Sequence, residues 1–286
     1  MKLCRFAAAA VPGIRVGLIQ DDGSVRDLTA CGVGSITEIL EGENPVLRVR
    51  QLAAAGSTVF PINAICLAPP IDRQEIWAAG VTYLRSKAAR MEESDFSASA
   101  YDRVYDAPRP EIFFKSLPHK ASGPGGPAGI RADAKWNVPE PELVLIFNSR
   151  GEHVGYTVGN DMSSRDIEGE NLLYLPQAKT YRYSCAIGPV IRIGASEAEA
   201  RSWKISITIS RGNDTVFSGE TAVSQIKRTF PELGGWLFRS QEYPFGAALF
   251  TGTGIVPPND FTLAAGDRVR IEIDGIGVLE NQVVVV

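Results

Sequence analysis

Two acidic residues stand at the entrance to an apolar run, and this arrangement limits how the chain can fold. Glu140 and Glu142 flank Pro141 and are followed by the apolar segment 143–147. The run predicts a strand, in which residues two positions apart point to the same face. Pro141 removes one ladder donor, which suits the first residues of a strand or an edge. The segment therefore predicts two carboxylates that project together where a strand begins.

A third acidic residue, Asp161, ends a second predicted strand over 155–161, and a hairpin would bring it near Glu140 and Glu142. Neighbouring carboxylates repel one another and lose hydration, and a cation between them offsets both effects. Three carboxylates favour Mg²⁺ or Mn²⁺, with Ca²⁺ as a further oxygen-preferring ion, over zinc. From spacing alone, an equally good interpretation places Glu140 and Glu142 on a solvated strand face and Asp161 in a turn.

The composition excludes several classes of function. The chain has 286 residues, of which 44% are hydrophobic and 22% charged, with a net charge of −4. An acidic chain without runs of lysine or arginine has no electrostatic reason to bind nucleic acid or an anionic membrane. No apolar stretch reaches the roughly 18 residues that a membrane helix needs. The four cysteines form no CxxC pair, so we expect free thiols, a reducing compartment and a cytoplasmic protein.

The pattern of predicted elements indicates an α+β protein that is mostly β. Residues 1–70 read as a small β-rich N-terminal lobe that opens with a strand, and residues 71–286 as one larger unit. Helices are expected at 36–40, 46–55, 83–93 and 221–239. Strands of the larger unit are expected at 75–79, 111–115, 142–147, 153–160, 190–193, 204–211, 249–251 and 269–273. Residues 84–105 are charged and poor in strand formers, which suggests a segment lying over a site.

Several motifs, in order along the chain, closely resemble those of the fumarylacetoacetate hydrolase superfamily. They are the metal-site segments 140–143 and 155–166, the lysine segment 175–179, the Gly-Pro turn 185–189 and the Thr-Gly-Thr loop 250–254. The resemblance covers about residues 71–286. It implies a mixed β-roll with a divalent metal at its mouth, held by Glu140, Glu142 and Asp161, and assembly into homodimers or homotetramers.

Segments 104–115 and 170–177 resemble the branch of this superfamily that dehydrates 2-keto-3-deoxy sugar acids such as 2-keto-3-deoxy-arabinonate. Carbon–carbon hydrolases of the superfamily carry a His and a Glu that activate water. Ser86 and Ala89 stand at the matching positions here, and a serine without a base is a poor activator of water. The resemblance thus implies a magnesium-dependent hydro-lyase, with a hydrolase of 2,4-diketo acids or acylpyruvates, an isomerase or decarboxylase, and a non-catalytic binding protein as alternatives.

The implied substrate is a small 2-keto acid that chelates the metal through its carboxylate and keto oxygens. Loss of a C3 proton would give a metal-stabilised enolate, and departure of the C4 hydroxyl as water would lead to a 2,5-dioxo acid. Lys179 is the candidate base at C3, or alternatively a partner that balances the three carboxylates. Glu92 and Glu93 are candidates for the second proton transfer, or solvated helix-face acids.

Further residues are candidates for binding the substrate. Thr253 and the backbone amides of its loop would hold the substrate carboxylate. Lys115, at the end of a predicted strand, is a candidate that faces the site. Ser86, Lys87 and Arg90 would bind hydroxyls or a carboxylate, and each is as easily a surface residue.

Overall fold

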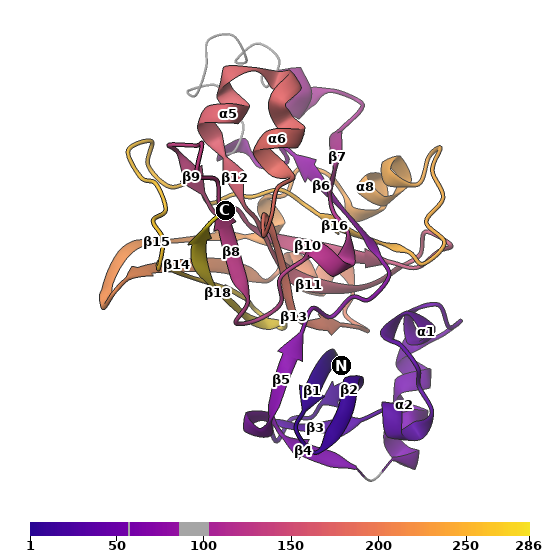
Figure 1. Ribbon diagram of the computed structural model, residues 1–286. Helices are drawn as coiled ribbons and strands as arrows, with labels where there is room; N and C mark the ends of the chain where they lie inside the picture. The colour runs from indigo at the N-terminus through magenta and orange to yellow at the C-terminus, as the bar shows by residue number, and fades with distance from the viewer. Residues whose placement is uncertain (57, 86–102) are drawn as a thin grey trace.

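The computed structural model describes residues 1–56, 58–85 and 103–286, and strands dominate it (Figure 1). The expected fold class, α+β with mostly β structure, is confirmed. The sheets are mixed, because β16 (Ala247–Phe250) pairs in parallel with β6 (Glu75–Gly80), whereas most other pairs are antiparallel. The expectations for residues 86–93, most of the helix proposed over 83–93, lie outside the described residues.

The N-terminal elements form a smaller unit beside the larger one (Figure 1). Its elements are β1 (Lys2–Ala8), β2 (Val11–Ile19), β3 (Ser24–Asp27), η1 (Thr29–Cys31), α1 (Ile36–Leu40), α2 (Pro45–Ala55), β4 (Val59–Pro61), η2 (Ile62–Ala64) and β5 (Ile65–Ala68). Ser35 and Asn44 cap the two helices by accepting from backbone N–H groups of the first turn, as N-cap residues commonly do. β1 pairs with β13 (Cys185–Arg192), so one sheet runs through both units.

That sheet has eleven strands, and its centre carries the hairpin identified in the sequence. The order is β4-β3-β2-β1-β13-β11-β10-β16-β6-β7, with β5 paired to β1. β10 (Pro141–Phe147) and β11 (His153–Asp161) are antiparallel neighbours at the middle of this order, and β7 spans Glu111–Ser116. Every residue of β10 is buried, which follows from its apolar run.

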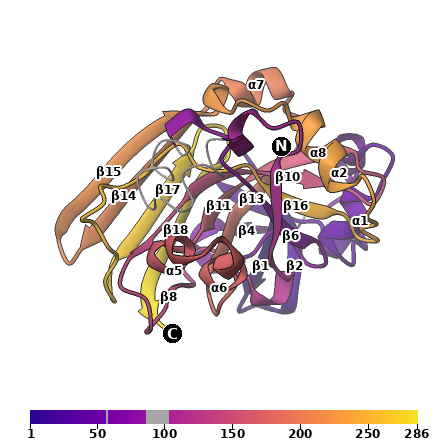
Figure 2. The same ribbon diagram turned by 90° about the horizontal axis from the view of Figure 1, so that it is seen from above.

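A second sheet packs beside the first, as the view in Figure 2 shows. Its strands are β8 (Pro127–Ile130), β14 (Lys204–Arg211), β15 (Asp214–Ala222), β17 (Arg268–Ile273) and β18 (Gly277–Val285). Leu143 and Leu145 of β10 belong to one hydrophobic core with Ile205 and Ile207 of β14. The alternate residue Val144 belongs to a second core shared with α1 and α2. The hairpin is therefore held from both faces.

Short elements cover the end of the hairpin that carries the acidic residues (Figure 1). The remaining elements are η3 (Pro118–Lys120), β9 (Asn137–Val138), β12 (Ser163–Ser164), α5 (Arg165–Glu170), η4 (Leu172–Tyr174), α6 (Leu175–Lys179), α7 (Glu197–Arg201), η5 (Val223–Gln225) and α8 (Phe230–Leu237). β9 pairs with β12, directly before α5. This pairing fixes where α5 and α6 begin relative to the hairpin.

The expected helix over 221–239 is wrong in its first half. Residues up to Ala222 continue β15 and pair with β14, and a helix begins only at Phe230. Thr229 accepts from the Glu232 N–H and Pro231 occupies the first turn, so the start signal lies there. β15 and β18 were not expected as strands. β15 follows β14 through the two-residue turn Gly212-Asn213, and β18 follows β17 through the turn 274–276, so both are hairpin partners whose turn signals were missed. Only the parallel pairing of β18 with β8 joins segments distant along the chain.

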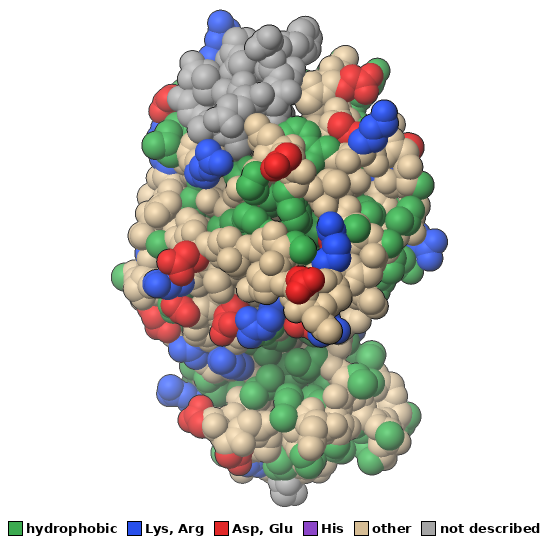
Figure 3. All heavy atoms as spheres, turned by 90° about the vertical axis from the view of Figure 1, so that its left-hand side faces the viewer, with side chains coloured by type: hydrophobic (Ala, Val, Ile, Leu, Met, Phe, Trp, Pro, Cys, Tyr) green, Lys and Arg blue, Asp and Glu red, His purple; other side chains and the backbone are tan. Residues whose placement is uncertain are grey.

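The surface in Figure 3 mixes acidic and basic side chains, and hydrophobic side chains gather where the two units meet. Among the described residues, no helix has both the length and the apolar character needed to cross a bilayer.

Candidate metal centre

The β10–β11 register brings the three predicted acidic residues to one end of the hairpin. Glu142 lies opposite Gly159, and Pro141 opposite Asn160. Beyond the last pair, the Asp161 N–H donates to the Glu140 carbonyl at 2.9 Å. The Asn160 side-chain carbonyl accepts from the Glu140 N–H at 3.2 Å. The backbone thus fixes the two strand ends against each other before any side chain is considered.

The carboxylates of Glu140, Glu142 and Asp161 converge. One oxygen from each lies within 4.8 Å of the others, and the side chains are buried. Since a surface strand face would leave them exposed, the solvated interpretation does not describe this arrangement. Three oxygen donors at this spacing match what Mg²⁺, Mn²⁺ or Ca²⁺ requires.

The electrostatics of the cluster also favour a bound cation. Burial raises the pKa of Glu142 well above its ordinary value, and the neighbouring carboxylates of Asp161 and Glu140 raise it further. Lys179 and the Gly252 N–H act in the opposite direction but do not reverse the shift. A divalent ion between the carboxylates would stabilise their ionised form. The donor set and its charge therefore fit a bound divalent metal.

Buried cations already contact the cluster, and two of them, Lys179 and Arg165, donate hydrogen bonds to its carboxylates. Lys179, the last residue of α6, donates from Nζ to Glu140 Oε2 at 2.8 Å and to Asp161 Oδ2 at 3.2 Å. Arg165, the first residue of α5, donates from Nη2 to Glu140 Oε1 at 3.0 Å. Lys179 was expected beside the carboxylates, and it lies there in the structure. Arg165 forms a buried ion pair with Glu140.

The loop after β16 closes another side of the cavity. The Gly252 N–H donates to Glu142 Oε2 at 2.6 Å. Gly252 has a φ of 85°, and a β-carbon there would lie 2.2 Å from Thr82 Oγ1, so only glycine fits. Thr253 lines the cavity and is buried, and its hydroxyl bonds with the backbone of Ile255. The loop thus presents Thr253 toward the space in front of the carboxylates.

Lys115 has contacts unlike those of a substrate-binding residue. Its side chain is 0% exposed, and it is not among the residues that line the cavity in front of the carboxylates. Its Nζ lies 2.5 Å from Asp161 Oδ1 and donates to the carbonyls of Met162 and Lys179. The expectation that Lys115 faces the substrate therefore does not fit its placement behind Asp161.

The other candidates for proton transfer and substrate binding, Glu92, Glu93, Ser86, Lys87 and Arg90, lie outside the described residues.

Three side chains that line the cavity were missed by the sequence analysis as site residues. They are Glu111 and Phe113 of β7 and Glu168 of α5. Glu168 accepts from the Ser163 hydroxyl at 3.0 Å. A signal for Glu111 was present, because strand alternation puts residues 111, 113 and 115 on one face. Lys115 was predicted to face the site, but Glu111 and Phe113, which share its face of the strand, were not.

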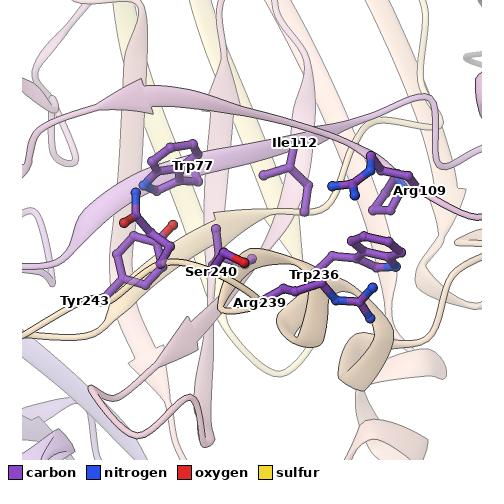
Figure 4. A pocket seen from close by; sticks show the side chains of 10 residues that line it. Trp77, Arg109, Ile112, Trp236, Arg239, Ser240 and Tyr243 are labelled. Atoms are coloured by element: carbon purple, nitrogen blue, oxygen red, sulfur yellow. The ribbon is translucent and has the colours of Figure 1, made fainter.

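A second cavity, of about 310 Å³, lies between the β6–β7 pair and the segment after α8. Figure 4 shows the Trp236 indole between the guanidinium groups of Arg109 and Arg239, whose Cζ atoms lie 4.5 and 3.7 Å from its ring centroid. No carboxylate is among the residues that line this cavity. It therefore offers no ligand set for a cation, and the metal chemistry belongs to the hairpin end.

Comparisons with known proteins show the family to which the chain is related. Residues 75–284 match the family model described as fumarylacetoacetate (FAA) hydrolase, C-terminal. A probable 2-keto-3-deoxyxylonate dehydratase of Haloferax volcanii is 48% identical over 217 residues, covering 76% of this chain and 74% of that protein. A 2-dehydro-3-deoxy-D-arabinonate dehydratase of Saccharolobus solfataricus is 40% identical over 223 residues, covering 77% and 75%.

Among solved structures, the chain is similar to 2-keto-3-deoxy-D-arabinonate dehydratase complexed with magnesium and 2,5-dioxopentanoate. The TM-score is 0.84 at 32% identity, covering 100% of this chain and 99% of the other. The similarity therefore extends to the N-terminal unit as well as to the larger one.

Proposed function

Because the chain belongs to the fumarylacetoacetate hydrolase family, we propose that it is a magnesium-dependent dehydratase that converts a 2-keto-3-deoxy sugar acid into a 2,5-dioxo acid. The observation that carries this proposal is the buried cluster of Glu140, Glu142 and Asp161. Relatives named for five-carbon sugar acids favour a 2-keto-3-deoxy-pentonate as the substrate.

Glu140, Glu142 and Asp161 would hold the metal. The bound ion supplies a Lewis acid that polarises the substrate's keto group and so makes the C3 protons more acidic. The chain itself contributes the fixed geometry, since Arg165 and the Gly252 N–H each hold one carboxylate in place. Preorganised donors of this kind need no rearrangement during the reaction.

The substrate carboxylate would lie toward the loop 251–254. Thr253 lines the cavity beside Glu142, and loop backbone at this position can present N–H groups to an anion. The same loop is tied down by Thr82, which donates to the Thr251 carbonyl. A rigid loop would orient the keto acid so that C3 faces the remaining wall of the cavity.

Glu111 and Lys179 are the groups on the described part of the cavity wall that we assign to proton transfer. Glu111 can accept the C3 proton, since its carboxylate lines the cavity without belonging to the metal cluster. Lys179 is held as a donor by two carboxylates, which suits delivery of a proton to the leaving C4 oxygen. The C3–H and C4–O bonds break, one water leaves, and the unsaturated acid tautomerises to the 2,5-dioxo acid.

A hydrolase on the same scaffold needs a group that activates water. Ser86 and Ala89 stand where related hydrolases carry the histidine and glutamate for this task. Without that pair, elimination of the substrate's own hydroxyl is the reaction that the remaining residues support.

A product assay with the purified chain tests the proposal. The protein is incubated with 2-keto-3-deoxy pentonates and hexonates, and separately with an acylpyruvate, in Mg²⁺ and in excess chelator. We expect a 2,5-dioxo acid, identified by mass spectrometry as its substrate minus one water, only when Mg²⁺ is present. Release of pyruvate from the acylpyruvate, with no dioxo product from any sugar acid, would establish the hydrolase instead.

We also propose a cytoplasmic location, which the four free cysteines support, and assembly into homodimers or homotetramers, on the basis of family resemblance. Light scattering coupled to size-exclusion chromatography measures the second point directly.

A further inference from the structure

The ammonium group of Lys115 connects three separate segments of the chain behind the metal cluster. From β7, its Nζ reaches Asp161 Oδ1 at 2.5 Å, the Met162 carbonyl at 3.1 Å and the Lys179 carbonyl at 2.5 Å. Two of its three N–H donors bind the two carbonyls, and the contact with Asp161 Oδ1 is an ion pair rather than a hydrogen bond. The group therefore binds the end of β11 and the end of α6 to one point.

Each carboxylate of the cluster has at least one oxygen held by a hydrogen-bond donor. For Glu140 the donor is Arg165, at 3.0 Å from Oε1, and for Glu142 it is the Gly252 N–H, at 2.6 Å from Oε2. For Asp161, Lys179 donates to Oδ2 at 3.2 Å, and the Lys115 ammonium lies 2.5 Å from Oδ1 as an ion-pair partner.

These contacts fix the orientation of the Asp161 carboxylate. Oδ1 lies beside the Lys115 ammonium, and Oδ2 accepts from Lys179 Nζ at 3.2 Å. The Lys115 side chain is fully enclosed, so its charge is balanced within the protein and not by solvent. Loss of that charge would release Asp161 from a single orientation.

We infer that Lys115 is a positioning residue that sets the orientation of Asp161 toward the metal and of α6 toward the substrate. This inference rests on the proposed metal-dependent function. Lys115 acts through Asp161 and through the backbone that carries Lys179, and it touches neither the metal nor the substrate. Partners that orient a metal ligand in this way contribute about 10- to 100-fold in metal affinity or activity.

The test compares Lys115→Met with Lys120→Met. Methionine keeps the length and apolar stem of lysine but removes the ammonium. Lys120 is exposed on η3, five positions along the chain, and offers the same substitution without the buried contacts. The affinity of the full-length, chelator-treated protein for Mg²⁺ alone is measured by calorimetry, and circular dichroism reports folding.

For Lys115→Met we expect the Mg²⁺ dissociation constant to rise at least tenfold, whereas Lys120→Met stays within twofold of the wild type. We also expect kcat at saturating Mg²⁺ to remain reduced, because the end of α6 is no longer fixed. A folded Lys115→Met protein with wild-type Mg²⁺ affinity would overturn the inference. If the Mg²⁺ dissociation constant rises but kcat at saturating Mg²⁺ equals that of the wild type, the result would support the role of Lys115 at Asp161 and overturn its role at α6.

A second variant, Lys115→Gln, keeps a donor for one carbonyl but no charge. If neither variant folds, Lys115 serves the fold and not the site, and the positioning role is overturned. The calorimetry uses no substrate, so its outcome is independent of the product assay: the wild type could fail to dehydrate any sugar acid while the Lys115 result still stands.

Discussion

Gly80 and Glu111 face each other across the β6–β7 pair, and a β-carbon on Gly80 would lie 2.0 Å from Glu111 Oε2. The carboxylate proposed to accept the C3 proton therefore occupies space that only a glycine leaves open. Both residues line the cavity in front of the metal cluster.

Replacing Gly80 by alanine should displace the Glu111 carboxylate. We expect kcat to fall by about tenfold or more, because misplacement of a reacting group by roughly 1 Å is sufficient for such losses. The Mg²⁺ affinity should stay near that of the wild type, since the β-carbon added at Gly80 would meet Glu111 and none of the three metal-ligand side chains. Steady-state kinetics and calorimetry measure the two quantities. Gly235→Ala in α8, where an added β-carbon meets nothing within 4 Å, is the control; an equal loss of kcat there would contradict this explanation.

Glu142→Gln should change stability in opposite directions with and without metal. Removing one of three buried carboxylates relieves repulsion, so the chelator-treated variant should unfold at a higher temperature than the chelator-treated wild type. In the wild type, Mg²⁺ at 100 times its dissociation constant should add about 2.7 kcal/mol to the free energy of unfolding. The Glu142→Gln variant should lose most of this stabilisation, and it should also lose turnover. Thermal unfolding in chelator and in Mg²⁺ gives both results. Unchanged Mg²⁺ stabilisation would remove Glu142 from the ligand set.

The assigned proton-transfer roles predict different effects for Glu111→Gln and Lys179→Met. A 2-keto acid without a C4 hydroxyl can exchange its C3 protons with D₂O but cannot eliminate water. We expect Glu111→Gln to slow this exchange by about 100-fold or more, in line with the usual contribution of a general base. Lys179→Met should retain more of the exchange while losing dehydration of the full substrate. Proton NMR follows the exchange, and the reverse pattern would interchange the two roles.

His153 should make stability depend on pH. Its ring, at the start of β11, packs 4.4 Å from the Tyr156 ring centroid, and Nε2 lies 2.9 Å from the Gly155 carbonyl. Burial lowers the pKa of His153 from 6.5 to about 4. Below pH 6.5 the unfolded chain gains a proton that the folded chain does not take up until about pH 4, so stability is full above 6.5 and falls as the pH drops between these values.

The expected loss is roughly 1–2 kcal/mol, smaller than the full pKa shift implies because the ring keeps some contact with solvent. Urea unfolding at pH 7 and pH 5 measures it. His153→Gln should show a flatter dependence over the same interval. A dependence as steep as that of the wild type would assign the effect to other groups.

Part of the metal cluster could be read from local pattern. Glu140 and Glu142 precede an apolar run, and strand alternation alone puts them on one face. Asp161 ends the next strand, and an antiparallel hairpin of neighbouring segments needs no knowledge of the rest of the chain. These three residues converge in the structure because the β10–β11 register is local.

Some elements were missed although they are local, such as β15 and β18, each of which follows its partner strand through a short turn. Other features depend on segments that are distant along the chain. Glu111 enters the cavity because β7 pairs with β6, whose Gly80 leaves room for its carboxylate.

By itself, then, the sequence predicted the class of the fold and the hairpin, because residues close along the chain obey a two-residue period, and its resemblance to a known family selected the oxygen-ligand set. Only the tertiary structure decided that Lys115 would lie behind Asp161, with Lys179 and Glu111 on the cavity wall. The physical reason is that β7 and α6 reach the hairpin end through packing between distant segments. The two-residue period of β7 puts residues 111, 113 and 115 on one face, but it does not record which of them will then face a carboxylate.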